Sequence, residues 1–303
     1  MSEIIKNRSE ILFLYDVKDA NPNGDPIDEN KPRIDEESGI NIVTDVRLKR
    51  TIRDYLYEHK GQEIFIRELR KEDGNLKTKE ERLDDFCNES IVEKCIDIRL
   101  FGSTTAVEDR TIVYTGPVQF KYGRSLHKVD LTYIKGTTVM PSGAERRQGT
   151  FTERYILPYS LIAFYGIVNE NAAKNQKIPL TETDIDLLLE AIWNGTKNLI
   201  SGSKFGQMPR WLMQVVYREG QDFYIGELDK LISMRSDKID ESIRDITDLK
   251  IDITALVKRL EEHMARIEKI RYKIDERITF IKDYNDIDIR EALAKLPITE
   301  LLI

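Results

Sequence analysis

The chain has 303 residues, of which 40% are hydrophobic and 33% are charged, and its formal net charge is −7. This composition is that of a charge-rich globular protein with a substantial core, and it excludes a chain that is disordered throughout. No run of about 18 apolar residues occurs, so no membrane span is expected. The polar residues 1–8 lack the apolar region of a signal peptide. Because the only cysteines are Cys87 and Cys95, without a flanking histidine pattern, we expect reduced thiols in a cytoplasmic protein.

The net negative charge argues against a generic nucleic-acid-binding protein, because such proteins usually carry a basic surface. The charge is uneven, however, since residues 121–154 contain seven Lys or Arg and three Asp or Glu, a net +4. A local basic surface on an acidic body can still bind phosphate, while the acidic remainder disfavours unspecific adhesion. An anionic partner at this segment is therefore compatible with the composition.

Residues 11–57 are predicted to form a strand, a long loop and a helix. Ile11–Val17 is a near-continuous apolar run, which is typical of a buried strand. The loop contains Asn21–Pro26, in which proline fixes φ and glycine or asparagine can take positive φ. Polar loops of this length are uncommon inside compact domains and are usually functional or disordered.

The helix of this segment is predicted to begin with Thr44 or Asp45 as its N-cap. Apolar residues recur at helical spacing, at Leu48, Ile52, Tyr55 and Leu56. The opposite side carries cations, namely Arg47, Lys49, Arg50 and Arg53. Such a face can hold a phosphate backbone. The plainer interpretation, that these cations are only the solvated side of an amphipathic helix, fits the pattern equally well.

Further along the chain, strands are predicted at residues 96–101 with 111–121, 155–168 and 210–218, in addition to a first strand at 10–18. A second helix, capped by Thr181 or Thr183, is predicted at 181–198. The order strand, helix, strand, strand, helix, strand is that of an RRM-like, ferredoxin-like fold. The fold class is therefore α+β with an antiparallel sheet, in one domain. The paired aromatic residues of a base-reading RRM are absent, so an RNA would have to lie elsewhere than on the sheet.

Two further segments are candidates for contact with an anionic partner. Residues 123–154 have proline and glycine between 137 and 149 and strand patterns on both sides, which predicts a protruding hairpin. The loop 203–207 contains Gly206, which allows close backbone approach to phosphate or sugar. The candidate side chains in and beside these segments are Arg124, Arg146, Arg147, Lys204, Gln207 and Arg210. A solvated loop tip and an ordinary helix-to-strand turn are the plainer alternatives.

Aspartates gather around the first loop, at Asp16, Asp19, Asp25 and Asp28. Hard cations take such oxygen ligands, so a metal-dependent nuclease site is an alternative. The EF-hand spacing is absent, however, and aspartate in turns usually accepts hydrogen bonds from its own backbone. The three histidines lack zinc-site spacing, and no nucleotide-binding or hydrolase motif occurs. No catalytic residue, metal site or cofactor is therefore predicted.

Short motifs follow one another in a characteristic order along the chain. They are Asn21–Asp25, Pro32–Asp35, Val43–Arg50, Asp97–Gly102, Thr115–Gln119 and Ser203–Gln207. In this order they resemble the repeated backbone subunit of CRISPR Cascade surveillance complexes, of the subtype I-B or I-C kind, in the RAMP superfamily. The resemblance extends over about residues 10–275, which is most of the chain.

This resemblance implies an RRM-like palm with a helical finger-like insertion at 60–95, a thumb hairpin at 123–154 and a C-terminal α/β extension packed on the palm at 226–303. It implies a non-catalytic subunit whose copies lie side by side along the CRISPR RNA (crRNA), the guide. The guide would be presented for base pairing with target DNA in an antiviral complex with other Cascade subunits. The residues predicted to bind RNA are Asn23, Arg47, Lys49, Arg50, Arg53, Arg124, Arg146, Arg147, Lys204, Gln207 and Arg210. A divalent-metal-dependent ribonuclease that uses a loop aspartate, and a structural oligomer without nucleic acid, stay open as alternatives.

Overall fold

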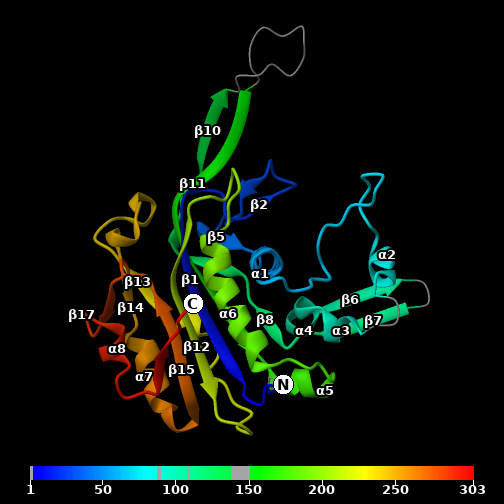
Figure 1. Ribbon diagram of the computed structural model, residues 1–303. Helices are drawn as coiled ribbons and strands as arrows, with labels where there is room; N and C mark the ends of the chain where they lie inside the picture. Colours follow the sequence, from blue (N-terminus) through cyan, green and yellow to red (C-terminus); the bar gives the residue numbers. More distant parts are fainter. Residues whose placement is uncertain (1–2, 87–89, 108–109, 138–150) are drawn as a thin grey trace.

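The centre of the molecule is one large, mainly antiparallel sheet (Figure 1). The computed structural model describes residues 3–86, 90–107, 110–137 and 151–303. Within these residues the main path of the sheet is β18 (Ile298–Glu300), β15 (Ile267–Ile274), β12 (Gln207–Tyr217), β1 (Ser9–Ala20), β11 (Phe151–Val168), β9 (Gly123–Lys128), β5 (Ile40–Val43) and β4 (Ile34–Asp35). Two more strands, β8 (Val118–Phe120) and β10 (Thr132–Thr137), pair with β11. The protein is therefore α+β with a predominantly antiparallel sheet, as predicted.

Strand β1 lies in the middle of this sheet and is buried on both faces. It pairs antiparallel with β11 on one side and with β12 on the other. Its side chains alternate between two hydrophobic cores, with Phe13 in one and Leu12 and Leu14 in the other, as the period of two in a strand requires. The presence of a core on each face explains why this strand is almost continuously apolar.

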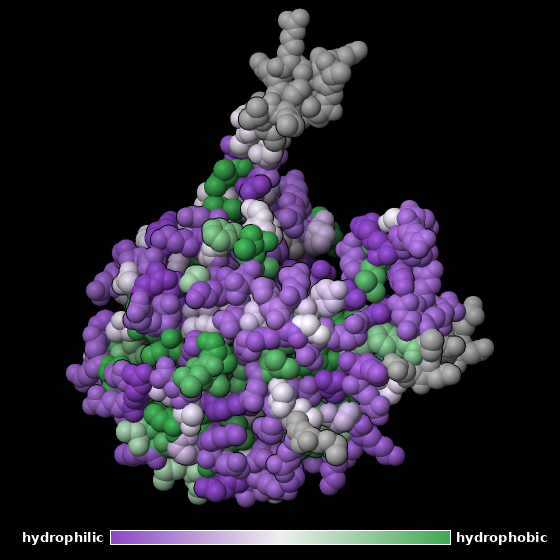
Figure 2. All heavy atoms as spheres, viewed as in Figure 1, coloured by the Kyte–Doolittle hydropathy of each residue, from purple (hydrophilic) through white to green (hydrophobic). Residues whose placement is uncertain are grey.

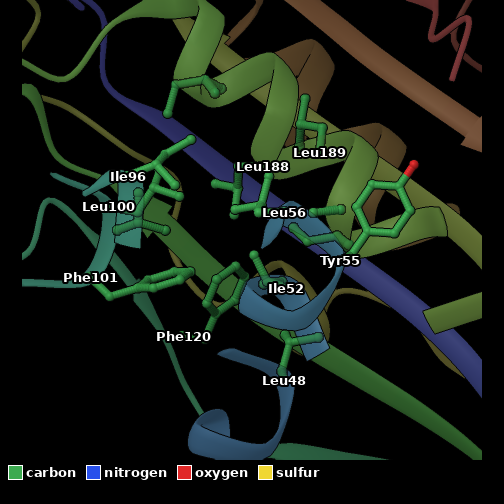
Figure 3. Close-up of a cluster of buried hydrophobic side chains, with 14 of the residues drawn as sticks. Leu48, Ile52, Tyr55, Leu56, Ile96, Leu100, Phe101, Phe120, Leu188 and Leu189 are labelled. Atoms are coloured by element: carbon green, nitrogen blue, oxygen red, sulfur yellow. The ribbon is translucent and has the colours of Figure 1, made fainter. Parts of the chain in front are cut away.

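Two helices, α1 (Asp45–Lys60) and α6 (Glu182–Lys197), cover one face of the sheet. Their N-caps are Thr44 and Thr181, and each side chain accepts a hydrogen bond from a backbone N–H of the first turn. Figure 3 shows the apolar side of α1, including Ile52 and Leu56, in one cluster with Leu188 of α6. The N-cap and the apolar stripe of α1 are thus as predicted from the sequence.

The C-terminal residues pack against the other face of the sheet. The elements here are β13 (Ser233–Arg235), β14 (Lys250–Asp252), α7 (Thr254–Glu262), β16 (Phe280–Lys282), β17 (Asn285–Ile287) and α8 (Ile289–Ala292). Trp211 of β12 meets Phe280 edge to face at 4.9 Å between ring centroids, and Leu256 and Leu260 of α7 are buried in the same core. Both faces of the central sheet are consequently covered by protein.

Residues 96–101 form a helix, α4 (Ile96–Phe101), and not the predicted strand. A short apolar run is ambiguous between helix and strand, and the alternation Ile96, Ile98, Leu100 favoured the wrong choice. All three side chains are fully buried, which a short helix enclosed by other elements allows. The helix ends at Gly102, which has φ 72°, a conformation that favours glycine.

The segment around α4 extends to one side of the sheet (Figure 1). It contains α2 (Lys79–Asp84), α3 (Ile91–Lys94) and a separate ribbon of β6 (Gly102–Val107) and β7 (Arg110–Thr115). The carboxylate of Asp97 connects this segment to the body, because its oxygens accept hydrogen bonds from the N–H groups of Phe65 and Ile66 at 2.8 and 3.0 Å. Asp97 therefore ties α4 to the chain that follows α1, at Phe65 and Ile66.

The projecting hairpin is shorter than the predicted segment 123–154. β9 pairs with β5 and β11 inside the main sheet, so only β10 and the first part of β11 form the projection in Figure 1. Residues 138–150, which include Arg146 and Arg147, lie outside the described residues. Arg124 belongs to β9 and pairs in register with Ile42 of β5, which places it in the sheet instead of on the hairpin.

The remaining elements are short connections. They are β2 (Gly24–Asp25), β3 (Lys31–Pro32), α5 (Glu170–Asn175) and the 3-10 turns η1 (Leu228–Lys230), η2 (Asp240–Ser242), η3 (Ile246–Asp248) and η4 (Met264–Arg266). Figure 2 shows a mainly hydrophilic surface with apolar groups on the stem of the hairpin, where Leu131, Tyr133 and Ile134 are exposed. In the described part of the chain, no helix has the length and apolar character needed to span a membrane.

Candidate nucleic-acid interface

Three segments that are far apart in the sequence meet at the end of β1. The backbone N–H of Asn21 donates to the carbonyl of Ser203 at 2.7 Å, and that of Lys18 donates to the carbonyl of Gly206 at 3.0 Å. The side-chain oxygen of Asn23 accepts hydrogen bonds from the N–H and the hydroxyl of Thr44, at 2.9 and 2.8 Å. The first loop, the N-terminus of α1 and the turn 201–207 therefore form one surface, and three of the predicted motifs supply it.

The first turn of α1 presents its positive end to this surface. Thr44 caps the helix by accepting a hydrogen bond from the N–H of Arg47 at 3.3 Å, and Asn23 in turn holds Thr44. The N-terminus of a helix carries a partial positive charge. Asn23 thus has a positioning role, because it ties the first loop to the capped end of α1.

Arg47 and Lys204 are two half-buried cations on this surface. Burial lowers the pKa of both groups; the charge of Asp54 partly opposes this shift of the Arg47 pKa, and the charge of Arg47 lowers the pKa of Lys204 further. The Arg47 guanidinium donates to the Thr51 hydroxyl at 2.9 Å, while its Nε is buried without a hydrogen-bond partner among the described residues. Neither cation forms an ion pair within the part of the chain that the structure describes. We call these two residues the cation pair.

Two positive charges that lie near each other with reduced hydration are unfavourable in the free protein. A bound anion would relieve this repulsion and would supply the missing acceptor for the Arg47 guanidinium. A phosphate group fits because arginine offers several N–H donors in a fixed plane and lysine offers a mobile point charge.

The other cations of α1 are engaged differently. Lys49 and Arg53 are buried, Lys49 beside Asp45 at 2.9 Å and Arg53 beside Asp97 at 3.0 Å. Arg50 is exposed and pairs with Asp54 at 2.7 Å. The predicted cationic face is therefore divided, and an RNA contact by Lys49 or Arg53 remains a prediction that their burial disfavours.

The end of the turn 201–207 also faces inward. Arg210 is buried between two carboxylates, with Asp16 at 2.8 Å and Asp275 at 2.7 Å. Gln207 is buried and donates to the carbonyl of Lys204 at 3.1 Å. Both side chains hold the turn in place. Their predicted contact with RNA is likewise disfavoured, because both side chains are buried and Arg210 is already paired with two carboxylates. These acids lie far from Arg210 in the sequence, so the pairing could not be predicted from sequence spacing.

Three of the four aspartates around the first loop, Asp16, Asp25 and Asp28, are engaged by cations of the protein. Asp16 is paired with Arg210, Asp25 accepts from Arg33 at 2.7 Å, and Asp28 pairs with Lys31 at 2.7 Å. Among the described residues, no group of three or more His, Cys, Asp or Glu side chains is arranged to hold a metal ion.

A cleft of about 650 Å³ lies between α1 and residues 65–82, and Arg47 of the cation pair is one of its lining residues. Its basic lining residues are Arg47, Arg50, Arg53, Arg67, Lys77, Lys79 and Arg82, and the acidic residue among the described lining is Glu68. Cations from the segment 65–82 were not among the predicted site residues, because acidic neighbours balance them in the sequence. In the folded chain several of these cations still pair with acids of the same segment, Arg67 with Glu63 at 3.8 Å, Lys77 with Asp85 at 2.6 Å and Arg82 with Asp85 at 3.2 Å.

Arg124 is a further cation at the edge of this surface. It lies in β9 opposite Ile42, and Ile42 is two residues before Thr44, the cap of α1. The Arg124 guanidinium is 3.7 Å from Asp35. Its side chain is 48% exposed, so it stays available to an anionic ligand.

Known proteins resemble this chain over most of its length. The family model described as CRISPR-associated protein Cas7 matches residues 7–254. A CRISPR-associated protein Cas7 from Haloferax volcanii is 34% identical over 319 aligned positions, which cover 94% of this chain and 91% of that protein.

Solved structures show the same fold. A chain of a CRISPR RNA-guided surveillance complex matches with a TM-score of 0.53 and 16% identity over 92% of this chain and 91% of that chain. A chain of a surveillance complex in a pre-nicking state matches with a TM-score of 0.55 and 11% identity, over 91% and 96% respectively. The family model and the Haloferax relative, each matching most of the sequence, show that this chain belongs to the Cas7 family of CRISPR-associated proteins.

Proposed function

We propose that this protein is a non-catalytic subunit that binds guide RNA in a CRISPR surveillance complex, with several copies along one crRNA. The observation that carries the proposal is the cation pair of Arg47 and Lys204, half-buried and without an ion pair in the described residues, of which Arg47 also lines the basic cleft. Family membership supports the same assignment, since the matching solved chains come from RNA-guided complexes.

The strand order supports an RRM-like palm in which the usual sheet surface is occupied. β12, β1, β11 and then β8 or β9 are neighbours, and β1 is antiparallel to both β11 and β12, which is the arrangement of a split βαβ fold. The C-terminal residues cover the face opposite to α1 and α6. We therefore propose that RNA lies at the end of β1, along the cation pair and the cleft, and not on the sheet.

In this proposal the protein holds the RNA through phosphates and leaves the pairing edges of the bases free. The cation pair binds one phosphate, and Arg50 and Arg124 add exposed positive charge on either side. Sequence reading is then delegated to base pairing between the guide and target DNA, as in other RNA-guided effectors. The hairpin of β10 and β11 projects from the body (Figure 1), and in this proposal it contacts a neighbouring copy, with other Cascade subunits as the further partners.

The proposal is tested by measuring RNA binding of the double variant Arg47→Met, Lys204→Met over a salt series. We expect the affinity for single-stranded guide RNA to fall by about 100-fold or more, since hydrogen bonds between charged groups contribute about 1.5–3 kcal/mol each. The dependence of log affinity on log salt should become shallower by about 0.7 for each phosphate that the variant no longer neutralises.

The matched control is Arg259→Met on α7. Its side chain is 50% exposed and pairs with Glu262 at 3.1 Å, and it lies on the opposite side of the sheet from α1. This variant should bind RNA like the unchanged protein. Equal affinity of the double variant and this control would contradict the proposal. Guide RNA incubated with Mg²⁺ should remain intact, and cleavage that disappears in Asp25→Ala would favour a ribonuclease instead.

A further inference from the structure

The turn 201–207 is held rigidly although it lies at the surface. The N–H groups of Lys204 and Phe205 both donate to the carbonyl of Ser201, at 3.1 and 3.0 Å. Gly206 has φ 110°, and a Cβ at this position would be 2.5 Å from the carbonyl oxygen of Lys18. Only glycine fits this close approach, so the backbone is held in place on both sides of Phe205.

Phe205 is 71% exposed on this rigid turn. In the described part of the chain, its ring takes part in no aromatic pair or cation–π contact. Large aromatic side chains are usually placed where they bury most of their surface. A braced turn that presents such a ring to solvent directly beside Lys204 gains nothing for the stability of the free protein, which points to an external partner.

We infer that Phe205 stacks on a nucleobase of the single strand whose phosphate is bound by the cation pair. The inference rests on the proposed function and adds a contact with a base to the contacts with phosphates. Consecutive Cα atoms are about 3.8 Å apart, so the Lys204 ammonium and the Phe205 ring can engage the phosphate and the base of one nucleotide or of two neighbouring nucleotides. Stacking tolerates every base because each has a π-face, so this contact does not restrict the sequence of the guide.

A second copy of the chain is the competing occupant for this ring. Binding between copies would depend on protein concentration and would not distinguish a strand with bases from one without. Stacking requires the base and is indifferent to its identity. These two properties define the experiment.

Binding is measured by fluorescence anisotropy with a single-stranded RNA and with an abasic ribose-phosphate strand of equal length. The proteins are the unchanged chain, Phe205→Ala, Phe205→Trp and the control Tyr284→Ala, which removes another aromatic ring, 87% exposed, from the turn between β16 and β17. We expect Phe205→Ala to weaken binding of the RNA by roughly tenfold and to leave binding of the abasic strand unchanged. Phe205→Trp should restore the affinity, and Tyr284→Ala should have no effect.

A fluorescent base analogue, 2-aminopurine, supplies an independent readout. Its emission should be quenched on binding to the unchanged protein and to Phe205→Trp, but less on binding to Phe205→Ala. Binding of RNA that is equal in Phe205→Ala and the unchanged protein would overturn the inference and leave the proposed function intact. An equal loss for both strands, with fewer copies per strand by mass photometry, would overturn it in favour of a contact between copies. If the unchanged protein bound neither strand, the proposed function itself would fail.

Discussion

Arginines at the two ends of the same surface have opposite surroundings. Arg210 is enclosed between Asp16 and Asp275, and its side chain is 4% exposed. Arg47 is half-buried with no carboxylate paired to it in the described residues, and Lys204 is close enough to feel its charge. A buried cation with an acidic partner stabilises the fold, whereas one without such a partner can bind a ligand. The position of a cation in a basic motif does not distinguish the two cases.

The largest effect is expected when the guanidinium of Arg210 is removed. Arg210→Leu should lower the free energy of unfolding by about 3–5 kcal/mol, because it leaves the Asp16 carboxylate buried without its compensating charge. Denaturant unfolding followed by circular dichroism measures the change, and the exposed Arg259→Leu serves as control.

The pH dependence of Arg210→Leu sharpens this prediction. Burial already raises the pKa of Asp16 while Arg210 opposes that rise, so the substitution should raise it further. Protonation then removes the uncompensated charge, and the deficit in stability should shrink as pH falls from neutral toward the raised pKa of Asp16. A deficit that stayed constant over this pH range would mean that lost packing, and not the buried charge, causes it.

The second prediction removes the charge of Lys204, one member of the cation pair. Lys204→Met keeps most of the aliphatic stem and removes a charge that burial and Arg47 both disfavour. We expect the free energy of unfolding to stay the same or to rise, while RNA affinity falls by roughly tenfold or more, the value for a charged hydrogen bond that can no longer form. Unfolding and RNA titration on the same preparation measure both. A marked loss of stability would place Lys204 with Arg210 as a structural cation.

This contrast also marks how far the sequence predicted the molecule. Features set by local chemistry were predicted, such as the Thr44 cap, the apolar stripe with Ile52, and the buried first strand. Ion pairs between distant residues were not, because Arg53 and Asp97 are 44 positions apart and Arg210 and Asp275 are 65 apart. Since the sequence does not show which acids pair with which arginines, it cannot tell a structural arginine from one that can bind a ligand.

The same limitation applies to the elements beyond the first helix. Residues 96–101 alternate like a strand, but all of them except Arg99 are buried, and a helix positions Asp97 to accept hydrogen bonds from two backbone N–H groups. The cations Arg67, Lys77 and Lys79 sit among acidic neighbours in the sequence and come together only across the cleft from α1. Arg67 and Lys77 keep acidic partners there, Glu63 and Asp85, so the position of these cations beside α1, and not a separation of charge, is the part of the site that pattern reasoning could not supply.

The third prediction concerns pH and uses the lowered pKa of Lys204. RNA binds the protonated lysine, so its pKa is higher in the complex than in the free protein, where it lies below the ordinary value of 10.5. Between these two values binding takes up a proton. Affinity should therefore fall as pH rises through this interval, by at most about tenfold per pH unit for one proton.

Titrations with 2′-O-methyl RNA, which resists alkaline hydrolysis, measure this dependence. In Lys204→Arg the charge persists at all these pH values, so the curve should become flatter. An unchanged slope in Lys204→Arg would show that another group titrates and would remove Lys204 from the binding site.

The smallest expected effect tests whether the cleft extends the site beyond the cation pair. Arg50 and Arg259 are matched, because each is on a helix, each is 50% exposed, and each pairs with an acid one turn away. Exposed pairs of this kind contribute little to folding, so both charge reversals to Glu should leave stability almost unchanged. Arg50→Glu should weaken RNA binding by about two- to fivefold at low salt, with the difference shrinking as salt rises, because exposed charges are screened. Arg259→Glu should not, since α7 packs against the opposite face of the sheet. Equal effects of the two variants in a salt series would mean that Arg50 acts only through the net charge of the protein, and the site would then be confined to Arg47 and Lys204.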